Sequence, residues 1–327
     1  MKGKLILEDG SVYMGELLHS DTKAVGEVVF TTTMTGYQES LSDPSFCGQI
    51  LTMTYPLIGN YGAAQKFMQS RRSFVHGFVI GELCDAPNNW QAEESLTDFL
   101  RGNNIPCLYN VDTRAVTRHI RSAGAMKGII VSKEAAESQI NALLGTALAR
   151  NVVEIVTTPE IYTLETEKPN APHIVAMDFG VKRSILQNIN RIGAKLTVVP
   201  AHTTADEVLA LNPDGIFLSN GPGDPADVPE ITEEIRKLAG KKPIFGICLG
   251  HQLLALAFGA RTYKMKFGHR GGNQPVKNLR TGKVHISAQN HGYAVAPDSL
   301  EGTPLVVTHT NVNDNTIEGL RHTSLPI

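Results

Sequence analysis

The pattern of apolar and polar positions divides the chain into two parts. In the first part the apolar run KLILE is followed by Asp9-Gly10 and the run SVYMGELL. Asp-Gly between two apolar runs is a strong hairpin signal. Further strand-like runs (EVVFTTT, QILTMTY and FVHGFVIGEL) precede helical periodicity in ESLTDFLRG, TRAVTRHIRS and EAAESQINALLG. We therefore predict a β-rich mixed domain over residues 1–156.

A change of pattern marks the end of this domain. Residues 157–172 carry three prolines and little periodicity, which is typical of a linker. Beyond it, residues 173–327 alternate strand-like runs (HIVAM, KLTVVP, GIFLS, PIFGI) with helical stretches near 182–192, 204–211 and 227–239. Such alternation predicts an open, mostly parallel α/β sheet with helices on both faces. Ligands of these sheets bind at the carboxyl ends of the strands, so the function is expected there.

Composition narrows the classes of function. The 327 residues are 42% hydrophobic and 19% charged, which is the balance of a folded globular protein. A net charge of −2 gives no reason to expect a nucleic acid or a membrane surface as partner. The four cysteines form no CxxC pair, and neither a signal peptide nor a long apolar span is visible. These features predict a cytoplasmic protein that is not membrane-bound.

The first chemical motif is a cysteine between a strand and a helix. Gly246-Ile247-Cys248-Leu249-Gly250 follows the run PIFGI and precedes the apolar run HQLLALAF. A nucleophile on such a sharp turn has a strained backbone, and glycines two positions away on each side avoid collisions. At the N-terminus of a helix, the dipole and the unpaired amides stabilise a thiolate. We therefore interpret Cys248 as a nucleophile.

A second motif lies at the end of the preceding strand. The run GIFLS leads into Asn220-Gly221-Pro222-Gly223-Asp224-Pro225, whose glycines allow backbone amides to approach a ligand. We expect the amides of Gly221 and Leu249 to hold a developing oxyanion, worth roughly 3 kcal/mol per donor. The alternative that this loop is only a turn becomes less favourable beside the cysteine motif.

Other conspicuous residues have simpler interpretations. Cys47, Cys84 and Cys107 are read as small apolar residues, and Asp178-Phe179-Gly180 as a turn at the end of a strand. The basic stretch with Lys264, Lys266, His269 and Arg270 is interpreted as a solvated rim, or otherwise as a surface that meets an acidic partner. The sequence predicts no metal-ligating set.

Longer motifs carry a family resemblance over nearly the whole chain. SNGPGDP, GICLGHQLLALAFGA, MKFGHRGGNQPV and AQNHGYAV resemble the class I glutamine amidotransferases, specifically the small subunits of carbamoyl phosphate synthetases. TTTMTGYQESLSDPSFCGQILTMTYPLIGNYG and YNVDTRAVTRHIRSAGAMKGII resemble the N-terminal domain that accompanies only that subunit. The N-terminal match argues against another class I amidotransferase.

The resemblance implies a reaction and a set of residues. Cys248 would attack the carboxamide of L-glutamine and form a thioester, and glutamate and ammonia would be the products. The glutamine-holding residues implied by the motifs are Ser45, Gly221, Gly223, Leu249, Gln252, Asn290, Gly292 and Tyr293. The ammonia would pass to a large subunit that uses ATP and magnesium to make carbamoyl phosphate for pyrimidine and arginine biosynthesis. No cofactor is expected in this chain itself.

One family motif is not found. The base and its orienting carboxylate come from a His-Pro-Glu motif in the family, whereas here His322 is followed by Thr323 and Ser324. Neither His251 nor His291 matches a catalytic role in the family. Cysteine catalysis needs a base within hydrogen-bond reach. Two interpretations therefore stay open: a glutaminase subunit whose gene product continues past Ile327, or a non-catalytic glutamine-binding or assembly subunit.

Overall fold

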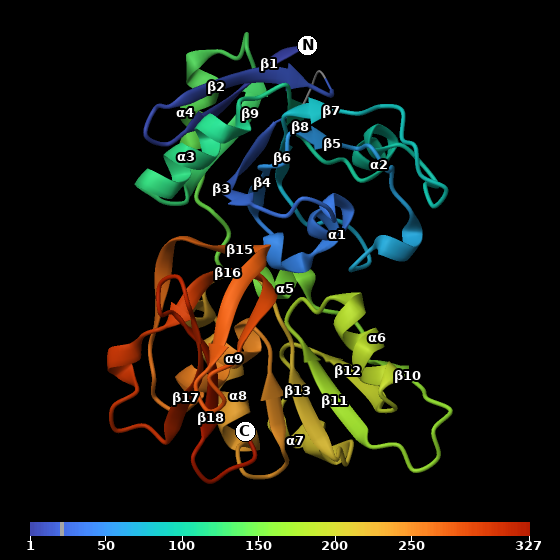
Figure 1. Ribbon diagram of the computed structural model, residues 1–327, viewed down its shortest axis with the longest axis vertical. Helices are drawn as coiled ribbons and strands as arrows, with labels where there is room; N and C mark the ends of the chain where they lie inside the picture. Colours follow the sequence, from blue (N-terminus) through green and yellow to red (C-terminus); the bar gives the residue numbers. More distant parts are fainter. Residues whose placement is uncertain (20–22) are drawn as a thin grey trace. The chain divides into compact units, whose positions relative to one another are not determined.

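The computed structural model describes residues 1–19 and 23–327 and divides the chain into two compact units. The first unit comprises Met1–Ala149 and the second Arg150–Ile327. Strand-rich structure fills the first unit, and alternating strands and helices begin the second, as Figure 1 shows. The predicted α/β class, with a β-rich mixed part before a mostly parallel sheet, is confirmed.

The first unit is built on a closed barrel, which the sequence pattern did not predict. Its order is β1-β2-β8-β6-β4-β3-β9. The strands are β1 (Lys2–Leu7), β2 (Val12–Leu17), β8 (Cys107–Tyr109), β6 (Gly77–Val79), β4 (Gln49–Met53), β3 (Ala24–Thr31) and β9 (Met126–Ser132). Closure leaves no unpaired sheet edge, which explains how strands as short as three residues are retained. A separate parallel pair joins β5 (Leu57–Ile58) and β7 (Glu82–Leu83).

Local signals of the first unit are matched by the structure. The predicted hairpin joins β1 and β2, and Gly10 adopts the positive φ of 88° that the turn requires. The expected helices are present as α2 (Leu96–Gly102), α3 (Thr113–Ala123) and α4 (Glu137–Gly145). A short helix α1 (Tyr37–Ser42) and the single-turn helices η1 (Pro44–Phe46) and η2 (Gln65–Phe67) complete the described elements. Helices α1 and α2 pack on the barrel core through Leu41, Leu96 and Leu100.

The second unit begins with the predicted parallel sheet. Its order is β10-β12-β11-β13-β14, and all neighbouring pairs except β10–β12 are parallel. The strands are β10 (Tyr162–Leu164), β11 (His173–Asp178), β12 (Lys195–Pro200), β13 (Gly215–Leu218) and β14 (Ile244–Gly246). The unit begins before the expected linker 157–172, and that segment contains β10, which pairs with β12. The segment is therefore held in the sheet rather than acting as a separate linker.

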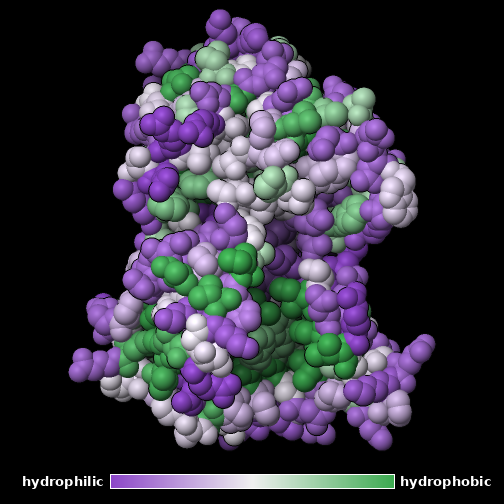
Figure 2. All heavy atoms as spheres, viewed as in Figure 1, coloured by the Kyte–Doolittle hydropathy of each residue, from purple (hydrophilic) through white to green (hydrophobic). Residues whose placement is uncertain are grey.

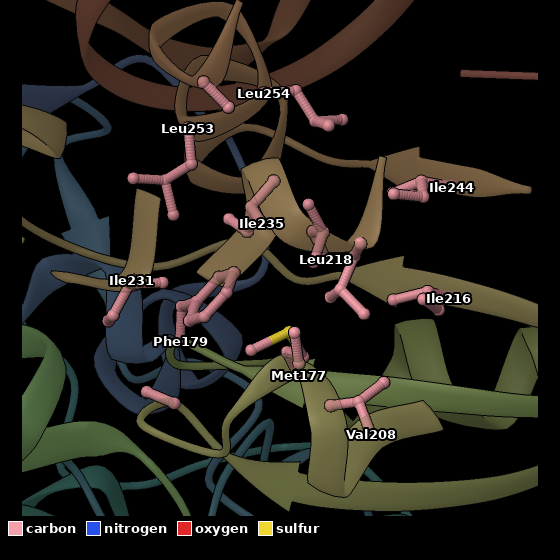
Figure 3. Packing of buried hydrophobic residues seen from close by; sticks show 14 of the residues in the cluster. Met177, Phe179, Val208, Ile216, Leu218, Ile231, Ile235, Ile244, Leu253 and Leu254 are labelled. Atoms are coloured by element: carbon pink, nitrogen blue, oxygen red, sulfur yellow. The ribbon is translucent and has the colours of Figure 1, made fainter. Parts of the chain in front are cut away.

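Helices cover both faces of this sheet. On one face, α7 (Ala205–Ala210), α8 (Pro229–Leu238) and α9 (Leu249–Ala257) contribute apolar side chains that meet those of β11, β13 and β14 (Figure 3). On the other face, α6 (Arg183–Arg191) packs Leu186 against Leu196, Val198 and Phe217. Helix α5 (Val152–Val156) and the single-turn helices η3 (Pro225–Asp227) and η4 (Pro297–Ser299) are also present.

Strand β14 lies at one end of this sheet, and part of it is open to solvent. Phe245 of β14 is 66% exposed and stacks on the buried Phe217 of β13. Figure 2 shows apolar side chains gathered around a hollow in the second unit, in the lower half of the view. The backbone N–H of Ile244 donates to the oxygen of Pro326 at 3.0 Å, so the segment before Ile327 runs beside β14.

A second sheet was not predicted from the sequence. Four antiparallel strands follow the order β16-β15-β17-β18: β15 (Thr262–Asn278), β16 (Val284–Val295), β17 (Leu305–Asn311) and β18 (Ile317–His322). The prediction that the basic stretch forms a solvated rim is wrong for two of its four residues. Lys264 and Lys266 are exposed, but His269 and Arg270 are buried. These two residues follow a register shift in β15 and pair with His291 and Asn290 of β16.

The turn after β11 is a structural feature, as expected for Asp178-Phe179-Gly180. The buried carboxylate of Asp178 accepts from the backbone N–H groups of Gly180, Val181 and Thr158. These bonds close the turn and tie the segment before β10 to the sheet. No helix among residues 1–19 and 23–327 has the length and apolar character needed to span a membrane.

Candidate functional site

Cys248 occupies the turn between β14 and helix α9. It is the residue that caps the N-terminus of α9, with φ of 53° and ψ of −106°. In the described parts of the chain, all other non-glycine residues with positive φ are asparagines, which tolerate this region. A cysteine has no such tolerance, so its conformation is strained and is maintained by the surrounding fold. Strain of this kind is concentrated at functional sites.

The glycines on both sides of Cys248 are required by close packing. A Cβ atom at Gly246 would lie 2.6 Å from the carbonyl carbon of Gly250. A Cβ atom at Gly250 would lie 2.3 Å from the backbone oxygen of Leu218. Backbone atoms cannot move away from such contacts as the end of a flexible side chain can. The sharp turn that presents Cys248 therefore depends on both glycines, as the sequence predicted.

The loop after β13 lies against the same turn. Leu218 of β13 is paired with Gly246 of β14, so the two loops leave neighbouring strand ends. A Cβ atom at Gly221 would lie 2.8 Å from Cδ2 of Leu249 and 2.2 Å from the oxygen of Phe179. Asn220 fixes the loop by donating from Nδ2 to the oxygen of Gly180 at 2.9 Å. The structure thus brings Gly221 next to Leu249, the two residues expected to supply oxyanion donors.

Gly223, further along this loop, has φ of 90°, and a Cβ atom there would lie 2.7 Å from Cγ2 of Val152. The loop therefore follows a path that a larger residue would not allow.

Strand β16 forms the other side of the site. The thiol of Cys248 lies 3.6 Å from the backbone oxygen of Asn290. One turn along α9, Nε2 of Gln252 donates to the backbone oxygen of Tyr293 at 2.6 Å. Gly292 lies between these two contacts, and a Cβ atom there would lie 3.0 Å from Nη2 of Arg270. Helix α9 and strand β16, which are about 40 positions apart in the sequence, therefore lie side by side at Cys248, since Cys248 and Asn290 differ by 42 positions.

Ser45 belongs to the first unit and is described within it. It lies in η1, two positions after Asp43, whose carboxylate accepts from the Ser45 backbone N–H at 2.9 Å. Ser45 is only 9% exposed. Its assignment to the glutamine site stays a prediction.

Of the histidines considered as bases, His291 and His322 have other hydrogen-bond contacts, and His251 is buried. Nδ1 of His291 lies 2.9 Å from the oxygen of Tyr293, and its Nε2 lies 3.6 Å from Glu318. Nδ1 of His322 accepts from the N–H groups of Ser324 and Leu325. Nε2 of His251 is buried with no hydrogen-bond partner in the described chain, and burial lowers the pKa of its ring to about 4. His251 is therefore neutral near pH 7.

The other cysteines differ from Cys248 in their surroundings. Cys47 and Cys107 are 5% and 0% exposed. Burial raises the pKa of the Cys47 thiol to about 11 and also raises that of Cys107. Cys84 is half-buried and donates to the oxygen of Ala86 at 3.5 Å. The interpretation of Cys47 and Cys107 as small apolar residues is confirmed by their burial.

Sequence reasoning missed one group of polar residues near the site. His269 of β15 lies 3.1 Å from Glu318 of β18 and 2.8 Å from Asp314. The only available signal was that His269 belongs to MKFGHRGGNQPV, one of the motifs of the family resemblance. Nothing in the local pattern indicates that a histidine in this basic stretch would be buried.

Comparison with known proteins gives the class of the second unit and then the family of the whole chain. Residues 175–327 match the family model "Glutamine amidotransferase class-I". The second unit is therefore a class I glutamine amidotransferase domain. Residues 5–130 match the model "Carbamoyl-phosphate synthase small chain, CPSase domain". The chain belongs to the carbamoyl phosphate synthase small chain family.

Full-length relatives agree with this assignment. The carbamoyl phosphate synthase small chain of Bacillus caldolyticus is 53% identical over 327 residues, covering 100% of this chain and 89% of the relative. The pyrimidine-specific small chain of Bacillus subtilis (strain 168) is also 53% identical, over 100% of this chain and 88% of the relative. The small chain of Syntrophotalea carbinolica is 50% identical, over 100% and 90%.

Proposed function

We propose that this chain binds L-glutamine and breaks its side-chain amide with Cys248 as the nucleophile. The thiolate attacks the carboxamide carbon, and the amide nitrogen leaves as ammonia after gaining a proton. Water then hydrolyses the thioester, which releases glutamate and regenerates the thiol. The observation that carries the proposal is the strained position of Cys248 at the N-terminus of α9, beside the loop of Gly221.

The surroundings of Cys248 support each part of this step. The first N–H groups of a helix have no partner within the helix, so the amide of Leu249 is suited to stabilise an oxyanion. The amide of Gly221 is proposed as the second donor because its loop lies against Leu249. The positive end of the α9 dipole favours the thiolate. Removing one oxyanion donor in enzymes of this kind costs about 3 kcal/mol of transition-state stabilisation.

The remaining glutamine contacts are proposed from residues of α9 and β16 that lie near Cys248. Gln252, Asn290, Gly292 and Tyr293 bring amide, hydroxyl and backbone groups that suit a zwitterionic amino acid. Gly223 is proposed to complete the pocket. The His-Pro-Glu motif of the family is not among residues 1–327. The proposal therefore assigns to this stretch of chain the nucleophile and the oxyanion donors, and not the general base.

Because the chain belongs to the small chain family, a second, large subunit is the expected acceptor of the ammonia. We propose that a large subunit, carrying ATP and magnesium, uses the ammonia to make carbamoyl phosphate. We propose a cytoplasmic setting, because none of the four cysteines, all of which lie in the described parts of the chain, is in a disulfide, as expected in a reducing compartment.

The proposal is tested by measuring glutamate release with a carbamoyl phosphate synthase large subunit present. Cys248→Ser is expected to reduce the rate by about 10³-fold or more, as loss of a nucleophile does. Cys84→Ser, which changes a half-buried thiol of the first unit, serves as the control and is expected to retain activity. Equal, measurable rates of glutamate release for parent and Cys248→Ser would refute the nucleophile assignment.

A second measurement tests the nucleophile without turnover. A diazoketone analogue of glutamine alkylates an activated thiol at the site, and peptide mass spectrometry identifies the labelled residue. Labelling of Cys248 that free glutamine suppresses, without glutamate release, would favour the binding-subunit interpretation. Labelling spread over Cys84 and Cys248, and insensitive to glutamine, would contradict a glutamine site at Cys248.

A further inference from the structure

Three side chains from strands β15, β16 and β18 of the antiparallel sheet lie close together, and one of them is next to Asn290. His269 of β15 and His291 of β16 are register partners, so their side chains stand opposite each other on one face. Their rings lie 5.0 Å apart between centroids. Glu318 of β18 reaches both rings, with oxygens 3.1 Å from Nδ1 of His269 and 3.6 Å from Nε2 of His291. One donor atom from each of the three residues lies within 4.8 Å of the others.

The outer nitrogen of each ring has its own partner. Nε2 of His269 lies 2.8 Å from a carboxylate oxygen of Asp314. Nδ1 of His291 lies 2.9 Å from the backbone oxygen of Tyr293. Histidines that bind metals almost always donate their other N–H to a carboxylate or a backbone carbonyl, which fixes the tautomer and the ring orientation. Both histidines show this arrangement, and their inner nitrogens face Glu318.

We propose that His269, His291 and Glu318 bind a divalent transition-metal ion, with Zn²⁺ as the best fit. Two imidazole nitrogens and one carboxylate form a zinc site with a fourth position left for water or another ligand. Ligand atoms at about 2.0 to 2.2 Å from zinc lie roughly 3.4 Å from one another. Oε1 of Glu318 lies 3.1 Å from Nδ1 of His269, and Oε2 lies 3.6 Å from Nε2 of His291, so each ring nitrogen has a carboxylate oxygen near this spacing. With one donor atom from each residue, the set lies within 4.8 Å, so a bound ion would draw the three side chains slightly closer together.

Burial distinguishes this cluster from an ordinary surface ion pair. The side chains of His269, His291 and Glu318 are 7%, 11% and 9% exposed. Weaker contacts of 3.4 Å join His291 to Gln289 and His269 to Asn311. Hard cations such as Mg²⁺ prefer oxygen ligands, whereas imidazole favours zinc, copper, iron and nickel. The donor set therefore selects a transition metal.

Without a metal, the same cluster is a histidine ring held between the side chains of Asp314 and Glu318. That arrangement accounts for the bonds of His269 to Asp314 and Glu318, and it leaves the inner nitrogen of His291 with only the 3.4 Å contact to Gln289 and the 3.6 Å approach to Glu318. A bound ion would join β15, β16 and β18 at one point. His291 stands between Asn290 and Gly292, so the ion would also fix the strand segment that faces Cys248.

The test is calorimetric titration of chelator-treated protein with ZnCl₂. Every arm carries Cys248→Ser, because a reactive thiolate binds zinc by itself. We expect one equivalent of zinc to bind and to raise the melting temperature. Adding Glu318→Gln, which keeps the shape of the side chain, is expected to weaken binding at least tenfold. The control is His285→Asn, which changes an exposed histidine of β16, the strand that carries His291. It is expected to leave zinc binding unchanged.

If the Glu318→Gln protein does not fold, a spectroscopic measurement on protein with the intact cluster tests the proposal instead. X-ray absorption at the zinc edge, on protein with an intact cluster, is expected to show two imidazole ligands and no sulfur. Absence of binding would overturn the proposal and leave a metal-free ion-pair network. Binding that is unchanged in a folded Glu318→Gln protein, or a spectrum with sulfur ligands, would overturn it as well.

Discussion

Gln252 and Tyr293 connect the helix that carries Cys248 to the strand that carries Asn290. Nε2 of Gln252 donates to the backbone oxygen of Tyr293 at 2.6 Å, and Gln252 is only 5% exposed. The backbone N–H of Gln252 in turn donates to the oxygen of Cys248 at 3.0 Å. The position of β16 relative to the nucleophile is therefore set by a buried side chain one helical turn away.

Gln252→Leu removes this donor while keeping a side chain of similar size. A lost buried hydrogen bond costs about 1–3 kcal/mol, and we expect the free energy of unfolding to fall by that amount. We expect KM for glutamine to rise about tenfold, equivalent to about 1.4 kcal/mol, with a smaller change in kcat. Urea unfolding and glutaminase kinetics measure the two effects.

The control for this prediction is Gln65→Leu, at an exposed position in η2. Such surface changes usually alter stability by no more than about 0.5 kcal/mol. If Gln252→Leu behaved like Gln65→Leu in both assays, the contact with Tyr293 would have no part in positioning the site.

The turn of Cys248 and the neighbouring Gly221 loop could be predicted from the sequence. The hydrophobic pattern there and the strand order of the sheet lead to the same arrangement. An apolar run before Cys248 and a helical run after it define the turn, and parallel pairing places the Gly221 loop at the neighbouring strand end. Both features follow from rules that hold for any alternating strand and helix pattern.

The rest depends on pairings between distant segments. The barrel joins β3, β4, β6 and β8 by parallel contacts between short strands, and no local periodicity specifies such a closure. Strand β15 is 17 residues long, contains irregular register and mixes exposed with buried positions, so it gives no clean alternation. The burial of His269 was missed because its partners, Glu318 and Asp314, come from a different part of the chain.

Gly250→Ala tests whether the turn around Cys248 has room for a side chain. The added Cβ would lie 2.3 Å from the oxygen of Leu218, so backbone must shift. Overpacking of this kind costs typically about 1–3 kcal/mol, and we expect unfolding in urea to show that loss. The rate of Cys248 alkylation by iodoacetamide is expected to change as well, because the same turn sets the exposure of the sulfur.

Gly272→Ala is the matched control for this substitution. A Cβ at Gly272 meets nothing within 4 Å, and the residue is exposed. We expect stability and alkylation rate to stay close to those of the parent. A Gly250→Ala protein that matches Gly272→Ala in both measurements would show that the turn is not closely packed.

The buried ring of His251 is expected to lower the free energy of unfolding in acid. Burial lowers the pKa of its ring to about 4, a shift opposed by Glu318 of β18 and reinforced by His291 of β16. In the unfolded chain the ring has its ordinary pKa of about 6.5. Between these values the unfolded state binds a proton that the folded state excludes, so the folded state loses stability as pH falls from about 6.5 toward 4. Above that window His251 has no effect on the pH dependence.

His269 is expected to have the opposite effect on the pH dependence of stability, because its pKa is raised. Burial disfavours its charged ring, but hydrogen bonds to Glu318 and Asp314 outweigh this and raise its pKa. Its contribution is present below the ordinary pKa and is lost as pH rises through the folded value. The effect of His251 must therefore be obtained by comparison with a variant that keeps His269.

His251→Gln removes the titrating ring from the helix that carries Cys248. At pH 4.5 the buried neutral ring lowers the free energy of unfolding of the parent by about 2 to 3 kcal/mol relative to neutral pH. The variant has no titrating ring at this position and does not lose this stability. Unfolding free energies in urea, measured for both chelator-treated proteins between pH 7 and 4.5, should therefore diverge in favour of the variant as pH falls. His285→Gln, at an exposed position, should follow the parent. Parallel curves for the parent and His251→Gln would mean that the ring takes up its proton in the folded state as easily as in the unfolded chain.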